Sequence, residues 1–214
     1  KIETDIDHYN AYFYSNIMPL ENLTFTVGAS GDFFDVDDKD VDQRDFDRNK
    51  FNPKLGVIWN PFVGTTLRGA VFKTFKRTLT TNQTLEPTQV AGFNQFYDDL
   101  TAAEAWNYGV AVDQKFTQKL YGGAEYTYRD LDIPFITDEP KVAEIDWDEK
   151  LARAYLYYTP HEWVALRAEY RYEDVERDEE NAFGIKEVKT HSVPLGLNFF
   201  HPSGISAGFQ ATYY

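Results

Sequence analysis

The sequence lacks cysteine entirely, and it has only one methionine and four histidines among its 214 residues. The absence of cysteine excludes disulfide bonds and thiolate-ligated metal centres, and it suits an oxidising envelope compartment. Apolar residues never form a run of the roughly 18 residues that a transmembrane helix needs. The chain therefore does not cross a membrane with helices.

Basic residues are also scarce, because 21 lysines and arginines stand against 35 aspartates and glutamates, for a net charge of −14. Proteins that bind nucleic acid need a basic face for the phosphates, so we predict no nucleic-acid partner. The chain opens with Lys1-Ile2-Glu3-Thr4, which has none of the features of a signal peptide. We therefore expect a mature or excised segment.

Aromatic residues are abundant instead, at 17% of the sequence. Many of them stand in segments that alternate between apolar and polar residues, which places the two sets on opposite faces of a β-strand. In the clearest segment, residues 163–173, the two alternating sets are Leu166, Ala168 and Tyr170 against Arg167, Glu169 and Arg171. The mean hydropathy of −0.52 is compatible with membrane strands, because only alternate residues of such strands meet lipid.

The alternation predicts ten strands, at residues 5–17, 23–35, 54–60, 66–75, 106–116, 120–129, 150–158, 163–173, 187–199 and 205–213. The connections between them are alternately short and long. Proline stands in most of the short turns, as at Pro61 and Pro202. The long polar loops are expected at 36–53, 76–104, 130–149 and 174–186. This arrangement is typical of barrels with tight periplasmic turns and extended external loops.

A soluble β-sandwich or lipocalin-like barrel also alternates, but its apolar face needs bulkier and more branched residues than the alanine, glycine and tyrosine found here. Aromatic residues gather beside the turns, as at Trp59, Phe116 and Phe199, where interfacial girdles belong. We therefore predict an all-β, antiparallel up-and-down transmembrane β-barrel of about ten strands. Residues 1–214 are expected to form one barrel domain, a fragment of a larger barrel without a plug or periplasmic domain. The expected location is the outer membrane of a Gram-negative bacterium, in contact with lipid and lipopolysaccharide.

Two adjacent segments carry a family resemblance. The first begins Phe51-Asn52-Pro53-Lys54-Leu55-Gly56 and ends at Asn60-Pro61, and the second runs from Thr66-Leu67-Arg68 to Lys76-Arg77. With the later Leu85-Glu86-Pro87, this strand pair resembles the barrels of TonB-dependent receptors, and the barrel style is similar to the C-terminal barrels of envelope proteins that carry tetratricopeptide repeats. The resemblance implies a pore or receptor-type channel for a hydrophilic solute or polymer. The alternative is a structural barrel that docks a periplasmic or other envelope protein partner.

Charged residues at the polar strand positions are expected to face the lumen. Charges on neighbouring strands can pair across the wall and stiffen it, or they can line a polar path for a solute. The expected lumen-facing residues are His8, Asp32, Lys54, Arg68, Asp113, Lys115, Lys119, Glu125, Arg129, Arg153, Arg167, Glu169, Arg171 and Glu173.

Aromatic residues in the long loops are the candidate contacts for an external ligand. They are Phe93, Phe96 and Tyr97 in the loop at 76–104 and Trp147 in the loop at 130–149. A solvated acidic loop or a loose calcium site is expected at Asp35, Asp37, Asp38, Asp40 and Asp42, because calcium prefers hard carboxylate oxygens. The spacing does not fit an EF-hand, and no other cofactor is expected.

Residues with catalytic potential are few, and we predict that the chain is not an enzyme. The sequence has no phosphate-binding loop, no nucleophile elbow and no metal-ligand spacing. The remaining enzymatic alternative is a protease at the outer rim, in which His8 or His191 would act together with loop carboxylates.

Overall fold

The computed structural model describes residues 4–38, 46–76, 86–96, 102–136, 142–178 and 185–214. The secondary structure of these residues consists of β-strands joined by turns. The strands are β1 (Thr4–Leu20), β2 (Leu23–Asp38), β3 (Phe46–Phe62), β4 (Thr65–Phe75), β5 (Gln89–Val90), β6 (Phe93–Asn94), β7 (Glu104–Lys115), β8 (Leu120–Ile136), β9 (Val142–His161), β10 (Val164–Arg177), β11 (Glu187–Phe200) and β12 (Ser206–Tyr213). Within the described ranges, no helix has the length and apolar character needed to span a membrane.

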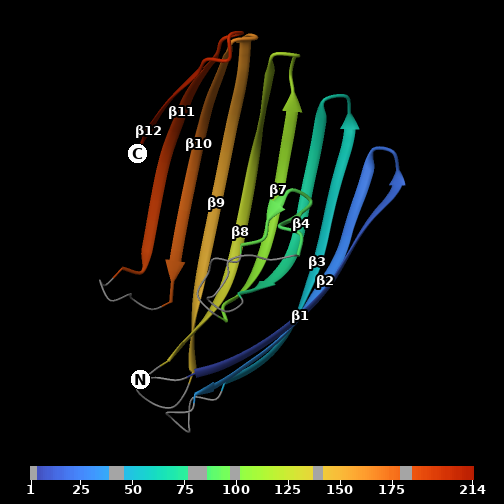
Figure 1. The fold of residues 1–214 in the computed structure, drawn as a ribbon, viewed down its shortest axis with the longest axis vertical. Helices are drawn as coiled ribbons and strands as arrows, with labels where there is room; N and C mark the ends of the chain where they lie inside the picture. The colour runs from blue at the N-terminus through green and yellow to red at the C-terminus, as the bar shows by residue number, and fades with distance from the viewer. Residues whose placement is uncertain (1–3, 39–45, 77–85, 97–101, 137–141, 179–184) are drawn as a thin grey trace.

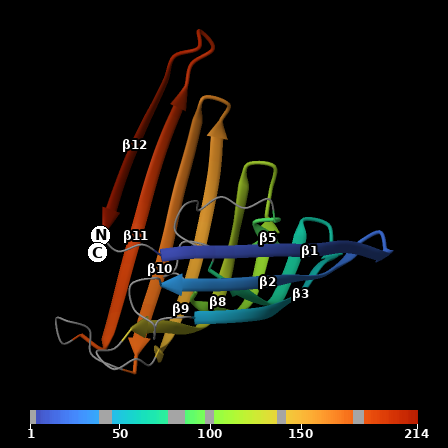
Figure 2. The same cartoon turned by 60° about the horizontal axis from the view of Figure 1, so that its bottom comes forward.

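Ten of these strands form one antiparallel sheet in the order β1-β2-β3-β4-β7-β8-β9-β10-β11-β12. Each strand pairs with the next long strand along the chain, so the up-and-down topology and the ten strands expected from the alternation are confirmed. The five short turns lie together at one end of the sheet, at the top of Figure 1. The described sheet is open, with β1 and β12 as its two edges, and Figure 2 shows that it curves strongly between them.

Several strands are longer than the alternation predicted. β2 and β3 remain paired as far as Val36 and Phe46, inside the loop expected at 36–53. β8 and β9 remain paired as far as Ile136 and Val142, inside the loop expected at 130–149. The two predicted loops were therefore wrong over much of their length. Backbone hydrogen bonds hold a ladder whatever the side chains. In β8, Leu131 and Ile133 alternate with aspartates and are buried, so the high content of acidic residues concealed a strand pattern that is present.

The two faces of the sheet differ in chemistry as the alternation predicted. On β10 the convex face presents Leu166 and Tyr170, which are exposed. The concave face presents Glu169, which is only 4% exposed, with arginines on either side. An apolar outer face and a polar inner face are typical of the wall of a transmembrane β-barrel.

The described part of the connection between β4 and β7 lies inside the concavity instead of extending outward. Figure 2 shows β5 within the space that the curved sheet partly surrounds. Residues 86–96, which we call the inner segment, contain the β5–β6 hairpin, and Val90, Ala91 and Phe93 of the hairpin are buried in a cluster with Ala70 and Phe72 of β4. The prediction of an outward polar loop at 76–104 is wrong for this described part.

The hairpin turn explains why the sequence pattern did not predict β5 and β6. Ala91 and Gly92 both have positive φ angles, of 48° and 84°, as a two-residue type I′ hairpin turn requires. Asparagine or glycine normally occupies the first of these positions, so the Ala-Gly pair lacks the usual signature. The contacts with the sheet must stabilise this turn.

Candidate functional site

The concave face carries the candidate site, and glycines in the wall let the inner segment approach it closely. A Cβ atom added at Gly109 on β7 would lie 2.5 Å from Cδ1 of Phe93, and one added at Gly56 on β3 would lie 2.7 Å from the Cβ of Ala91. Larger residues at either position would collide with the segment. The absence of side chains at two wall positions therefore creates the seat for residues 90–93.

Polar contacts tie both ends of the inner segment to the wall. The Tyr14 hydroxyl on β1 donates to Glu86 Oε1 at 2.5 Å, and Gln95 Nε2 donates to the same hydroxyl oxygen at 2.9 Å. Lys54 Nζ on β3 lies 3.8 Å from Glu86 Oε1. These groups are partly or fully buried, so each hydrogen bond compensates for a polar group that has lost water. The segment is thus fixed at both ends as well as at its apolar centre.

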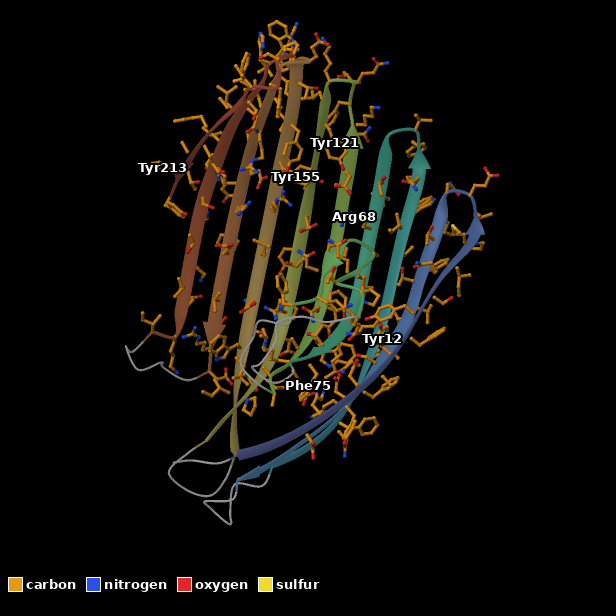
Figure 3. All side chains as sticks on the ribbon, in the orientation of Figure 1. Tyr12, Arg68, Phe75, Tyr121, Tyr155 and Tyr213 are labelled. Carbon is orange, nitrogen blue, oxygen red and sulfur yellow. The ribbon has the colours of Figure 1, made fainter. Side chains whose placement is uncertain are left out.

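Arg68 on β4 joins the inner segment to the charged wall, and Figure 3 labels it near the middle of the sheet. Its Nε donates to Asp113 Oδ2 at 2.7 Å, and its Nη2 donates to Glu125 Oε2 at 3.2 Å. Its guanidinium also lies 5.0 Å from the centroid of the Phe93 ring. One cation is therefore shared between two carboxylates and an aromatic face.

Arg129 on β8 repeats this arrangement closer to the long-loop end of the sheet. It donates to Glu149 Oε2 at 2.6 Å and to Asn107 Oδ1 at 3.1 Å, and its guanidinium lies 4.7 Å from the Phe96 ring centroid. A hollow of about 90 Å³ lies beside it, between the inner segment and the wall. Phe93 and Phe96 line the hollow on one side, and Asn107, Glu125 and Arg129 line it on the other.

A second group of charges lies on β9 and β10, and we call Arg153, Arg167, Arg171 and Glu169 the arginine cluster. Glu169 Oε1 accepts from Arg153 Nη2 at 3.1 Å, and Glu169 Oε2 accepts from Arg171 Nη2 at 2.7 Å. Arg167 Nε lies 3.8 Å from Oε1 of the same carboxylate. The Glu169 side chain is 1% exposed, whereas the three arginine side chains are 28–40% exposed. The carboxylate is thus covered by cations that themselves face the lumen.

Tyrosines connect the two charged groups across the wall. Tyr121, Tyr155 and Tyr157 lie with ring centroids 5.4–6.3 Å apart, and Figure 3 labels the first two on β8 and β9. The Tyr155 hydroxyl donates to Asp113, and the Tyr157 hydroxyl donates to Glu169 Oε1 at 3.1 Å. The strand alternation did not identify Tyr14, Glu86, Gln95 or Tyr157 as parts of the site.

The predicted lumen residues fall into three sets. Nine of the expected charges contribute to ion pairs on the concave face, namely Lys54, Arg68, Asp113, Glu125, Arg129, Arg153, Arg167, Glu169 and Arg171. Lys115, Lys119 and Glu173 are exposed, and the first two lie beside the β7–β8 turn. His8 Nε2 lies 3.0 Å from Asp32 Oδ1, which also accepts from Asn10 at 2.9 Å.

The predicted ligand contacts are placed less uniformly. Phe93 is buried at 3% exposure, whereas Phe96 is exposed. Tyr97 lies outside the described residues. Trp147 lies on β9 rather than in a loop, and the Arg177 guanidinium stands 3.8 Å from its ring centroid. The burial of Phe93 and the exposure of Phe96 depend on packing against the wall, which the sequence pattern does not show.

The remaining candidate residues do not assemble into a described site. Asp40 and Asp42 lie outside the described residues, and the side chains of Asp35, Asp37 and Asp38 are not described either, so the calcium site stays a prediction. His8 lies on β1 and His191 on β11, where Nδ1 of His191 lies 2.8 Å from the Tyr170 hydroxyl. Within the described ranges, no group of three or more His, Cys, Asp or Glu side chains is arranged to hold a metal ion.

An up-and-down antiparallel sheet with an apolar convex face and a charged concave face defines the wall of a transmembrane β-barrel. The chain belongs to the TonB dependent receptor-like, beta-barrel family, whose sequence model matches residues 3–142. The predicted family resemblance is therefore confirmed. No curated protein matches the sequence.

Solved structures of similar fold agree with this assignment. The FrpB iron transporter from Neisseria meningitidis is 11% identical with a TM-score of 0.70, and the match covers 99% of this chain and 33% of that chain. The ferripyoverdine receptor of the Pseudomonas aeruginosa outer membrane is 12% identical with a TM-score of 0.60, covering 99% and 32%. The alcaligin outer-membrane receptor FauA from Bordetella pertussis is 13% identical with a TM-score of 0.63, covering 97% and 37%. The chain spans about a third of the length of these proteins.

Proposed function

We propose that this chain forms part of the wall of a receptor-type channel for a hydrophilic solute in the outer membrane of a Gram-negative bacterium. Family membership supports the receptor class. The observation that carries the solute path is the concave face, where charged groups and tyrosines continue from β4 to β10. The convex face is the surface that would contact lipid and lipopolysaccharide.

The solute class follows from the chemistry of the concave face rather than from the matched structures. Those structures include an iron transporter and receptors for ferripyoverdine and alcaligin, but identities of 11–13% show a shared fold alone. The ion pairs and hydroxyl groups of the wall provide hydrogen-bond donors and acceptors for a polar solute. The aromatic rings provide flat surfaces against which such a solute can pack.

Cysteine labelling on intact cells tests this function, because the chain contains no cysteine of its own. Arg171 and Tyr170 are adjacent on β10 and lie on opposite faces, so Arg171→Cys places a thiol in the lumen and Tyr170→Cys places one towards lipid. We expect a water-soluble maleimide to label the first variant of the gene product and to leave the second unlabelled. A scaffold barrel whose lumen is filled by a partner protein would leave both unlabelled, and that outcome would overturn the proposal.

A further inference from the structure

We propose that the arginine cluster is a binding site for an anionic group, a carboxylate or a phosphate, on the solute that passes this wall. The inference rests on the proposed function and adds the substrate class to it. The site consists of the guanidinium groups of Arg153, Arg167 and Arg171 around the Glu169 carboxylate on β9 and β10.

The first argument is the imbalance of charge. Three guanidinium groups surround the Glu169 carboxylate, in a chain whose net charge is −14. The neighbouring group around Arg68 has the opposite composition, with one cation between Asp113 and Glu125. Glu125 also stands directly opposite Arg153 in the pairing of β8 with β9, so the two groups are counted together. Four arginines then stand among three carboxylates, and one positive charge remains.

The second argument is that pairing alone does not require this composition. Arg153 already donates to both oxygens of Glu169, through Nε at 3.3 Å and Nη2 at 3.1 Å. A second and a third arginine add repulsion between cations and lose side-chain entropy when they are ordered. One arginine is enough for a stabilising ion pair with Glu169. Binding of an anionic ligand accounts for the other two arginines.

The third argument is preorganisation and access. Glu169 holds the nearest guanidinium groups in place, and the aromatic ring of Tyr155 supports Arg153 at 4.7 Å from its centroid. Arg167 lies over Gly196 of β11. Because glycine has no side chain, this neighbour does not cover the Arg167 guanidinium. The side chains of Arg167 and Arg171 are 35% and 40% exposed on the concave face. Planar guanidinium groups held in this way match the oxygens of a carboxylate or phosphate group, and arginines serve this purpose in pores for anions.

A reporter cysteine beside the cluster tests the proposal. Ala165 lies on the same face of β10 as Arg167, two residues away, so Ala165→Cys places a thiol at the site. Anionic and cationic methanethiosulfonate reagents of similar size are applied to the variant gene product in lipid vesicles. We expect the anionic reagent to react faster, and the ratio of the two rates to fall roughly tenfold when Arg167→Gln and Arg171→Gln are added.

Inorganic phosphate, compared with chloride at the same ionic strength, separates a binding site from a diffuse positive field. We expect phosphate to slow the anionic reagent more than chloride does, and this difference to disappear in the double glutamine variant. That variant keeps Arg153, so Glu169 retains a partner and the fold is not left with a buried unpaired charge. Arg129→Gln is the matched control, because Arg129 pairs with Glu149 outside the cluster and its loss should leave the rate ratio unchanged.

The outcomes distinguish the two proposals. Equal rates for the two reagents, or equal effects of phosphate and chloride, would overturn the anion site while leaving the channel intact. A cysteine at position 165 that reacts with neither reagent would mean that the lumen is filled at this level. That result would overturn the proposed function, and the anion site with it.

Discussion

The concave face has a covered half and an open half. In the covered half, β1 to β8, the inner segment packs on the wall, and Phe72, Val90 and Phe93 are as buried as residues in a globular core. In the open half, β9 to β12, no described segment covers the wall, and every residue of β12 is exposed. The same alternating strands thus support both a packed core and a solvated surface, and the difference comes from the inner segment.

This comparison assigns different tasks to the two halves. The inner segment covers this part of the wall and holds Arg68 and Arg129 against the rings of Phe93 and Phe96. The arginine cluster of the open half remains accessible from the lumen. Under the proposed function, a solute would contact the arginine cluster, whereas the inner segment covers the wall around Arg68.

Removing the aromatic anchor of the covered half should have the largest effect. Phe93→Ala deletes a buried ring, and we expect it to cost about 3–5 kcal/mol of the free energy with which the inner segment docks. Amide hydrogen exchange at Gln95, whose N–H donates to the Thr88 carbonyl at 2.8 Å, measures that docking. Phe209→Ala on β12 is the control, because its exposed ring leaves no cavity and should leave this exchange rate unchanged. If the Gln95 amide exchanges at the same rate in both variants, the covered half is not a packed core.

The second-largest effect is expected from charge substitutions on the two faces of the open half. Leu166→Arg puts a charge on the lipid-facing side of β10 and should cost about 2–4 kcal/mol near the bilayer midplane. Arg167→Leu, one residue further along, faces the lumen and should be milder. Folding titrations of both variants into lipid vesicles compare them, and equal tolerance would show that the faces are assigned incorrectly.

A side chain at the glycine seat should push the inner segment off the wall. Gly109→Ala brings a Cβ within 2.5 Å of Phe93 and should cost about 1–3 kcal/mol as overpacking. Limited proteolysis within residues 86–96 reports the displacement. Gly196→Ala on the open half is the matched control, since its Cβ would meet the nearest atom of Arg167 at 3.5 Å, an ordinary contact. Cleavage that is equally slow in both variants contradicts a tight seat.

The smallest effect is expected at the polar tie between β1 and the inner segment. Tyr14→Phe removes the hydroxyl that joins Glu86 and Gln95, and the loss should be about 1 kcal/mol. Tyr9→Phe on the same strand removes an exposed hydroxyl and serves as the control. Hydrogen exchange of the inner segment is again the measurement. A larger effect at Tyr9 than at Tyr14 would mean that the tie does not hold the segment.

Much of the candidate site was predictable because it depends on strand alternation. Arg167, Glu169 and Arg171 must share a face once residues 163–173 form a strand, and the register then brings Arg153 opposite Arg171. The imbalance of three arginines around one glutamate was not predictable in the same way. It depends on which inward charges of β9 and β10 become neighbours, and this is decided by register and side-chain reach.

The sequence by itself determined the order of the ten long strands and their two faces, because these follow from a local period of two residues. Only the tertiary structure decided that residues 86–96 turn inward, since the positive φ angle of Ala91 and the burial of Phe93 are stabilised by contacts with β3, β4 and β7. These contacts join residues that are separated in sequence, such as Gly56 and Ala91. A local pattern records which residues can face inward, whereas the free energy of non-local packing determines which of them are covered.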